Sequence, residues 1–294
     1  ARTVIVPLSL VLTQKIVCPL PEERGIKEIF NQPPCPPKKN FPFFSIKNGF
    51  WLLDRILKIY EKFPWKPLRK KAIQKVEQWI LDRQQKDGTW GGIQAACLYT
   101  LIGLGSLGYK ASHPVIEKCL NGIIEHYSFE SEGALRIDAT CSPIWDTCLM
   151  VTALIDSGLP IDHPMITKAV DFLQKKQIKS DGDWKIKNPK GVPGGWAFEF
   201  DNNYYPDNDD TSEVLIALCH YQKHLLNPSQ SLEETIKRGI NWMLSMQSKN
   251  GGWGTFDKDN TKCFLVQSPF FDYGDILDPP SVDMTSHVLE ALAN

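Results

Sequence analysis

Residues 238–253, RGINWMLSMQSKNGGW, are one of three copies of a pattern in this chain. Residues 75–90 (KVEQWILDRQQKDGTW) and 168–184 (KAVDFLQKKQIKSDGDW) repeat the basic residue, the aromatic–aliphatic pair, the Gln and the Gly turn that presents a Trp. Each copy predicts a helix with a Gln near its C-terminal end, where a side-chain amide can bond backbone groups that the helix leaves open. The Trp face can stack over that amide. We interpret the copies as fasteners between helices, without a catalytic role.

The rest of the chain has helical periodicity, Gly and Pro punctuation, and no convincing alternation typical of strands. The predicted helices between the copies span residues 93–107, 113–126, 146–157 and 211–221. The sequence therefore predicts an all-α fold of paired helices, which either stack into an open solenoid or close into a ring.

Composition restricts the classes of function. The 33 basic and 34 acidic residues nearly cancel, so nucleic acid is not an expected partner. The eight cysteines have neither C-x-x-C pairs nor zinc-finger spacing, which predicts free thiols in a reducing compartment. The apolar stretch 4–20 is interrupted by Pro7, Gln14 and Lys15, so it predicts neither a signal peptide nor a membrane span.

The length of 294 residues suggests about two domains. Residues 33–39, PPCPPKK, forbid a helix and predict a linker or loop. Both ends of the chain fall inside patterned sequence. We therefore expect a piece of a longer chain, truncated at both ends.

Residues 207–211, Asp-Asn-Asp-Asp-Thr, place three carboxylates within four positions. Their mutual repulsion favours keeping one of them protonated near neutral pH, which is a way to build an acid. The preceding residues 194–206, GGWAFEFDNNYYP, surround the carboxylates with aromatic rings, whose faces attract positive charge. An acid beside aromatic walls indicates chemistry on a cation.

The acid motif also has two other interpretations. The segment from Thr211 onward is typical of a helix start, so Asp209 or Asp210 could be only an N-cap. The motif alone favours a helix cap and a catalytic acid equally. A calcium loop is excluded, because no Gly stands at its sixth position and no Glu at its twelfth.

Residues 50–63 predict a helix with a broad apolar face, an aromatic start and several basic residues. Such a helix buries its apolar face in a core or lies on a lipid surface. The residues alone favour the core.

Four features together resemble the squalene-hopene cyclases over essentially the whole chain. They are the three Gln/Trp copies, the acid motif at 207–211, SPIWDT at 142–147 and DPPSVDMTSHV at 278–288. The resemblance implies two α/α barrels (toroids), both incomplete here, with residues 1–129 in the smaller inserted barrel and 130–294 in the larger catalytic one.

The resemblance also implies an activity. Family members cyclise squalene to pentacyclic hopene or hopanol, in hopanoid biosynthesis, by general-acid catalysis without a metal or organic cofactor. They are attached to one leaflet of a membrane, here expected on the cytoplasmic side of a bacterial membrane, and a homodimer is an open alternative. Helix 50–63 corresponds to the membrane-dipping helix, which favours the lipid-surface interpretation. A fragment without the remaining helices is expected to be inactive alone.

Roles for individual residues follow from the same resemblance. Asp209 corresponds to the proton donor, and His287 to the histidine that hydrogen-bonds it. The supporting acids are Asp207, Asp210, Asp146 and Asp283. Candidate cavity-lining residues are Trp145, Phe198, Ile93, Trp196 and Phe256, and those of the substrate constriction are Phe270, Phe271, Asp272 and Tyr273. Phe256 stands where many members carry Tyr, so the resemblance does not define the product.

The chemistry explains why these residue types are needed. An alkene is a very weak base, so the donor must hold a proton and also release it readily; a cationic His287 favours the carboxylate left behind. Asp283 and His287 stand at i and i+4, so a carboxylate is expected to hold the imidazole and favour its charged form. The migrating cation then needs dry aromatic walls.

Other functions compete with this one. Another proton-initiated cyclase, of the sesquarterpene or class II diterpene type, has the same starting chemistry. Cyclases that open an epoxide usually carry Cys where Asp210 stands. Prenyltransferase β subunits share the helical ring but use a zinc site of Asp, Cys and His that is not evident here. A non-enzymatic helical toroid explains the copies and leaves the acid motif unexplained.

Overall fold

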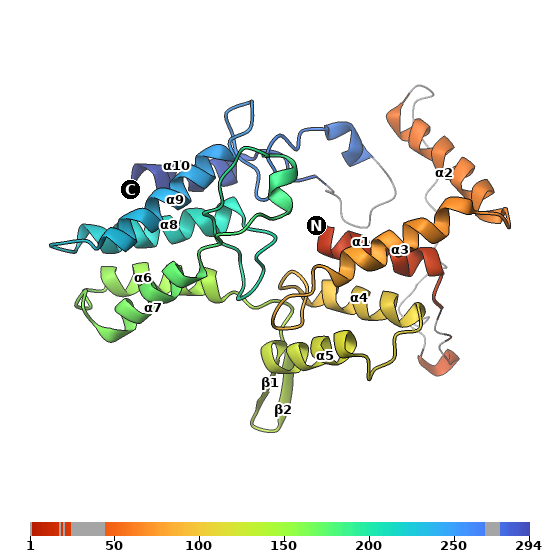
Figure 1. Cartoon of the computed structure of the whole chain (residues 1–294), viewed down its shortest axis with the longest axis horizontal. Coiled ribbons are helices and arrows are strands. Elements are labelled where there is room, and N and C mark those ends of the chain that lie inside the picture. Colours follow the sequence, from red (N-terminus) through yellow and green to blue (C-terminus); the bar gives the residue numbers. More distant parts are fainter. Residues whose placement is uncertain (1, 18, 20, 25–44, 268–276) are drawn as a thin grey trace.

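The computed structural model describes residues 2–17, 19, 21–24, 45–267 and 277–294 (Figure 1). Its helices and strands are, in chain order, α1 (Arg2–Gln14), η1 (Glu22–Arg24), α2 (Ile46–Lys62), α3 (Pro67–Leu81), α4 (Gln94–Ser106), α5 (Pro114–Tyr127), β1 (Ser128–Ser131), β2 (Ala134–Ile137), α6 (Pro143–Asp156), α7 (Pro164–Lys176), η3 (Asp183–Ile186), α8 (Asn208–Lys223), α9 (Gln230–Ser245), η4 (Cys263–Gln267) and α10 (Val282–Ala293).

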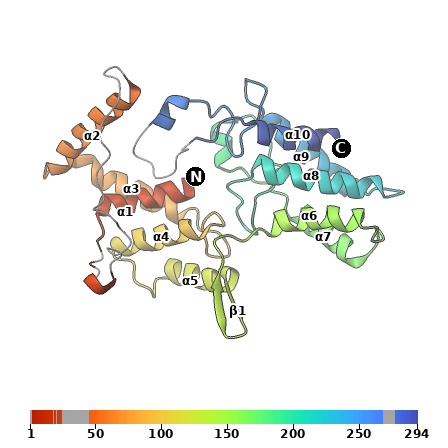
Figure 2. The ribbon, with the colours of Figure 1, turned by 180° about the vertical axis from the view of Figure 1, so that it is seen from behind.

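The helices form two lobes (Figures 1 and 2). Helices α1, α3, α4 and α5 make one lobe, with α2 projecting from it, and α6 to α10 make the other. The predicted all-α class is confirmed. The predicted loop at 33–39 lies outside the described residues.

A small hairpin was not predicted. Strands β1 and β2 pair antiparallel with Ser128 opposite Ile137, and Glu132 and Gly133, both with positive φ, form the turn between them. Two consecutive positive-φ residues are typical of a tight hairpin turn. Each strand has four residues and none is buried, so the pair leaves no alternating apolar signature.

Helix starts follow from residue type. Helices α3, α5, α6 and α7 each have Pro in their first turn, where the missing N–H would have no partner within the helix. The start of α1 carries no such signal, and Pro7 stands inside it. Helix α1 was therefore not predicted from the sequence.

In the first and second repeat copies the Gln fastens helices as expected, whereas Gln247 of the third copy donates to the carbonyl of Gly251 in its own turn (2.8 Å). Gln84 Nε2 donates to the carbonyls of Gly88 (3.0 Å) and Val115 (2.8 Å), the latter in the first turn of α5. Gln177 Nε2 donates to the carbonyls of Gly194 and Thr235, both at 2.8 Å. The amides of Gln84 and Gln177 thus tie their own turns to a neighbouring helix.

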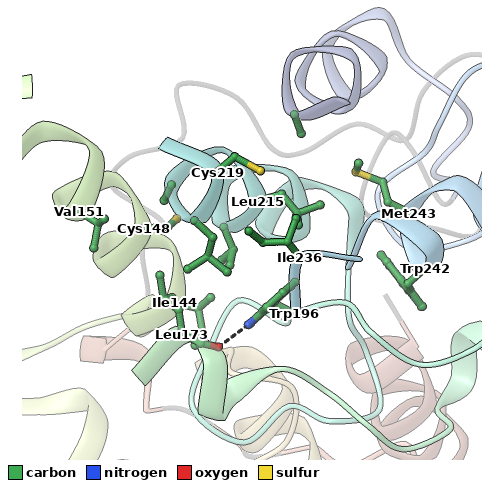
Figure 3. Close-up of a cluster of buried hydrophobic side chains, with 14 of the residues drawn as sticks. Ile144, Cys148, Val151, Leu173, Trp196, Leu215, Cys219, Ile236, Trp242 and Met243 are labelled. Carbon is green, nitrogen blue, oxygen red and sulfur yellow. Dashed lines mark hydrogen bonds between the residues drawn. The ribbon is translucent and has the colours of Figure 1, made fainter. Parts of the chain in front are cut away.

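The structure corrects the second copy. In the first and third copies the indole of Trp90 or Trp253 donates to a carbonyl ten positions earlier. In the second copy the indole that bonds the corresponding carbonyl, that of Leu173, belongs to Trp196 and not to Trp184 (2.7 Å, Figure 3). The turn of the second copy is therefore Gly194-Gly195-Trp196, after an insertion that the sequence pattern did not separate from it.

That insertion joins the two lobes. Asp183, 5% exposed, accepts from Arg83 Nη2 (2.7 Å) of the first lobe and from the hydroxyl of Tyr205 (2.8 Å). Arg2 at the start of α1 lies 3.0 Å from Asp257 and 3.7 Å from Asp183. Asp183, taken from the sequence as part of a repeat turn, instead holds one lobe against the other, whereas Trp184 packs near Trp242 of its own lobe.

Each lobe has its own apolar core. One cluster of buried side chains runs from Leu10 to Cys119 and the other from Ile144 to Ala291 (Figure 3). The clusters fall on either side of the predicted boundary between residues 129 and 130. The division into two barrels itself stays a prediction.

Helix α2 differs from the other helices. None of its residues is buried, so the described chain does not cover its apolar face, and its role at a lipid surface stays a prediction. Within the described parts of the chain, no helix is long and apolar enough to cross a membrane.

Candidate active site

The turns of two repeat copies hold the first turn of α8. Asp207 N–H donates to the carbonyl of Trp196 (2.9 Å), and Trp196 N–H donates to Thr211 Oγ1 (3.0 Å). From the third copy, the carbonyls of Thr255 and Gly254 accept from Asn208 N–H (2.9 Å) and from its side-chain amide (2.7 Å). The acid motif is thereby fixed between two fasteners.

Helix α10 starts in the same way. Ser281 N–H donates to the carbonyl of Trp253 (3.1 Å), and Trp253 N–H donates to Thr285 Oγ1 (3.2 Å). Ser281 therefore matches Asp207, and Thr285 matches Thr211. Because the repeat copies set both helix starts, they also set where α8 and α10 present their side chains.

The N-cap of α8 is Asp207, and not Asp209 or Asp210 as the cap interpretation had it. Asp207 Oδ1 accepts from the backbone N–H of Asp210 at 2.8 Å, the bond that an N-cap makes to the third helical residue. Asp207 and Asp210 are 2% and 3% exposed. Both carboxyl groups are therefore enclosed by the protein.

Asp209 lies on the accessible side of the same turn. Its side chain is 33% exposed, and its Oδ1 lies 2.7 Å from Nδ1 of His287 on α10, whose side chain is 31% exposed. Seventy-eight positions separate the two residues in the chain. The predicted contact between acid and imidazole is present.

Burial and charge determine the protonation of the cluster. Burial, followed by the charge of Asp210, raises the pKa of Asp207 well above its usual range. Burial also raises the pKa of Asp210, to about 6, against a lowering hydrogen bond with Asp207. The crowding predicted from the sequence therefore keeps a proton chiefly on Asp207. The hydrogen bond to Asp209 raises the pKa of His287, against partial burial.

One residue of the cluster was missed. Glu213 Oε1 lies 3.8 Å from the same Nδ1 of His287, and its side chain is 17% exposed. Partial burial raises the pKa of Glu213, and the charge of His287 opposes this. Its position four residues after Asp209 was the available signal, because i and i+4 share a helix face.

The other predicted acids are placed differently. Asp283 contributes to the raised pKa of His287 through its charge, after Asp209 and Glu213, but the bond that holds the ring comes from Asp209. Asp146 is exposed on α6 and accepts from Ser142 Oγ at 2.9 Å. Among the contacts of the described residues, none joins Asp146 to Asp209 or His287.

The residues predicted to line the cavity or the constriction fall into three groups. Trp196 has no exposed surface and packs against Gly239 of α9, where a Cβ would lie 2.8 Å from its ring, so its assignment to a cavity wall is corrected to the core. Ile93 and Phe256 are each 39% exposed, and Trp145 and Phe198 are half-buried. Phe270, Phe271, Asp272 and Tyr273 lie outside the described residues.

Phe256 lines a cavity of about 220 Å³ between the lobes. The wall also includes Ile5 and Val6 of α1 and Tyr205 and Pro206 just before the acid motif. Ligand pockets usually have roughly 300–1,000 Å³, so this cavity is smaller than a usual ligand pocket. Among the described residues, no three His, Cys, Asp or Glu side chains come together to hold a metal ion.

Another buried carboxyl group, that of Glu199, lies at the junction of the lobes. Glu199 is 4% exposed, and its Cδ lies 2.4 Å from where a Cβ on Gly92 would be, which explains why residue 92 is Gly. Burial, then the charges of Asp87, Cys97 and Asp201, raises the pKa of Glu199 to about 8, and a hydrogen bond with Gln85 opposes the rise.

This pKa predicts a pH-dependent stability. Because the folded pKa is raised, the stabilisation from neutral Glu199 is complete below its unfolded pKa near 4.5 and is lost as pH rises to about 8. At pH 8 the free energy of unfolding of Glu199→Gln should therefore exceed that of the wild type by on the order of 2 kcal/mol, and its melting temperature should be higher. The difference should vanish near pH 4.5. Thermal melts across this range, with Glu125→Gln as an exposed control, check the expectation. A constant difference at every pH would contradict it.

Two family models match the chain. The model of the squalene-hopene cyclase N-terminal domain matches residues 1–132, and that of the squalene-hopene cyclase C-terminal domain matches residues 141–294. The helical structure agrees with the toroid fold of these domains.

Similar curated proteins include cyclases from bacteria and a fern. The chain is 41% identical to a squalene–hopene cyclase of Alicyclobacillus acidocaldarius over 298 aligned residues, covering 100% of this chain and 46% of the relative. It is 36% identical to a dammaradiene synthase of Dryopteris crassirhizoma (99% and 42% covered) and 32% identical to a squalene–hopene cyclase of Zymomonas mobilis (100% and 45% covered). The chain spans less than half the length of these relatives.

Proposed function

The chain belongs to the squalene-hopene cyclase family, and from this premise we propose that it carries the acid centre of an enzyme that cyclises squalene to hopene or hopanol. The observation that carries the proposal is the 2.7 Å contact between Asp209 Oδ1 and His287 Nδ1. Of the three clustered acids, Asp209 alone is accessible, and it is held by an imidazole whose pKa is raised.

Asp209 starts the reaction by donating a proton to a terminal alkene of the substrate. The charged His287 stabilises the carboxylate that remains, which makes proton transfer to so weak a base less unfavourable. Neutral Asp207 and the bonds from both repeat turns keep Asp209 from moving as its charge changes. Trp145, Phe198 and Phe256 supply aromatic faces that attract the cation as it migrates.

The cyclisation balances without an oxidant or reductant. One proton enters at the terminal alkene and carbon–carbon bonds form along the polyene. The last cation then loses a proton to give hopene, or adds water, which loses a proton, to give hopanol. The protein folds the polyene substrate, donates one proton to it and excludes water until the last step.

Turnover of squalene tests the proposal. The protein, expressed as its full natural chain, is incubated with squalene, and the extract is analysed by gas chromatography with mass spectrometry. Pentacyclic hopene or hopanol is the expected product. Turnover of a shorter or longer polyprene without turnover of squalene would instead support another proton-initiated cyclase. A dammarane-type product would still support the acid as proton donor, but would show that the cation is quenched in a different way.

We further propose that α2 attaches the protein to one leaflet of a bacterial membrane, on its cytoplasmic side. The helix combines an apolar face with basic residues, which suits a position at a lipid interface. The exposed apolar residues of α2 are Ile46, Trp51, Leu52, Leu53, Ile56, Leu57, Ile59 and Tyr60. Attachment to the membrane brings the enzyme to a substrate that dissolves in lipid.

Binding to lipid vesicles tests the attachment. Leu52, Ile56 and Ile59 follow helical spacing, so changing all three to Ser should weaken binding to phosphatidylcholine–phosphatidylglycerol vesicles by roughly 10-fold or more. Leu226→Ser is the matched control, because Leu226 is 98% exposed in the other lobe. Equal co-sedimentation of the triple variant and the wild type would refute the role of α2.

A further inference from the structure

We propose that Glu213 is a positioning residue that keeps His287 charged while Asp209 holds its proton. The proposal rests on the function proposed above and adds a residue to its acid centre. Glu213 lies on α8 four positions after Asp209, and its Oε1 is 3.8 Å from the ring nitrogen that Asp209 contacts at 2.7 Å. Two carboxyl groups of one helix therefore face a single nitrogen of another.

The need for a second carboxylate follows from the charges in the two states of the acid. After proton donation, Asp209 is a carboxylate and is itself the partner of the imidazolium. Before donation Asp209 is neutral, so the positive charge on His287 loses this partner at the moment when it is most needed. Glu213 can supply the negative charge in that state, because an opposite charge within about 4–6 Å favours the charged form of a group.

The surroundings of Glu213 favour this role. Its side chain is 17% exposed, against 33% for Asp209, so water screens its charge less. The charge of His287 lowers the pKa of Glu213 and opposes the rise caused by burial, which shows that each group influences the other's ionisation. Helix packing is tight here, since Val214 and Leu215 on one side and Val288 on the other are fully buried.

The other charged groups around His287 do not replace Glu213. Asp283, on the helix of His287 itself, is exposed and contributes less to the raised pKa than Glu213. Asp210 is buried and hydrogen-bonded to Asp207. Glu290 is exposed and acts on Glu213 through its charge. Among the described residues, Asp209 and Glu213 are the only carboxyl groups within 4.0 Å of the imidazole.

The pKa of His287 in Glu213→Gln tests the proposal. NMR titration of His-labelled protein, with the His287 signal assigned by its loss in His287→Gln, gives this value without any turnover. The Gln variant should lower the pKa of His287 by roughly half to one unit, because one nearby charge is removed at a partly exposed site. Glu213→Asp, which keeps the charge, should restore part of the shift.

Glu290→Gln is the matched control, since it removes the same charge from the exposed neighbour of Glu213. It should move the pKa of His287 much less. An unchanged pKa of His287 in Glu213→Gln, or equal shifts in Glu213→Gln and Glu290→Gln, would overturn the proposal, even if Glu213→Gln lowers the melting temperature.

The same variant separates this inference from the proposed function. In the active enzyme, Glu213→Gln should lower kcat several-fold at neutral pH and move the alkaline limb of the rate profile to lower pH, with KM little changed. If the wild type does not cyclise squalene, the proposed function fails while the NMR result still decides the role of Glu213. If Glu213→Gln changes the pKa of His287 but not the pH–rate profile, Glu213 affects the ionisation of the imidazole without acting in proton donation. The proposal is then rejected.

Discussion

Replacing Asp209 by Asn should lower the cyclisation rate by roughly 10³-fold or more while leaving the fold intact. An amide has nearly the shape of the carboxyl group and can still bond His287, but it cannot give an acidic proton to an alkene. Asp209 is neither the N-cap nor buried, so the loss should not come from unfolding. Asp209→Glu should also be strongly impaired, because the added methylene moves the proton from its place beside the substrate.

A second Asp–His pair in the same lobe provides the control. Asp156 Oδ1 lies 2.9 Å from His220 Nε2 between α6 and α8, at a surface position where Asp156 is 64% exposed. Asp156→Asn should keep full activity. Product formation is measured from squalene, and thermal melting is followed for each variant. Near-normal turnover by Asp209→Asn would remove Asp209 from the donor role.

Replacing His287 by Gln should lower kcat by roughly 10²-fold, with a small change in KM. Gln can still donate a hydrogen bond to Asp209 but carries no positive charge, so the carboxylate formed on proton transfer loses its stabilisation. Because the reaction needs a charged His287, the wild-type rate should fall as pH rises and the imidazolium loses its proton. The variant should lack this alkaline limb.

His220→Gln is the corresponding control, and it should leave both kcat and the pH profile as in the wild type. The measurement is kcat and KM for squalene between pH 5 and pH 9. A full alkaline limb in His287→Gln would mean that another group causes it. An equal loss in His220→Gln would indicate a general effect of removing a histidine from this lobe.

Local patterns predicted most of the helices, because Pro at helix starts, Gly after helix ends and apolar periodicity are properties of a few adjacent residues. Helix α1 was not predicted because Pro7 stands inside it. The hairpin was not predicted because its short strands are exposed. Both depend on tertiary surroundings more than on local pattern.

The second repeat copy shows how spacing alone can mislead. A Gly and a Trp follow Gln177 at nearly the expected distance, and this favoured Trp184 as the repeat tryptophan. The hydrogen bonds identify Trp196, because its indole bonds the carbonyl that the other copies use. Trp184 is instead buried near Trp242, with ring centroids 5.9 Å apart. An insertion that ends in a similar turn cannot be separated from the original turn by pattern.

The acid motif was recognised, but its internal division of roles was not predictable. Crowding indicates that one carboxyl group keeps a proton, while burial decides which one, and burial depends on the neighbouring turns. Those turns bury Asp207 and Asp210 and leave Asp209 accessible to His287. Glu213 was missed because its role depends on α10, which starts 69 positions later in the chain.

Cyclisation in deuterium oxide tests the central claim most directly. If Asp209 starts the reaction with a solvent-exchangeable proton, squalene should give hopene with one deuterium at carbon 3 of the first ring, where the alkene CH takes up the proton. Mass spectrometry and ²H NMR locate the label, and Asp209→Asn should give no labelled product. A product without deuterium at carbon 3, or one that bears oxygen there, would contradict protonation of an alkene as the first step.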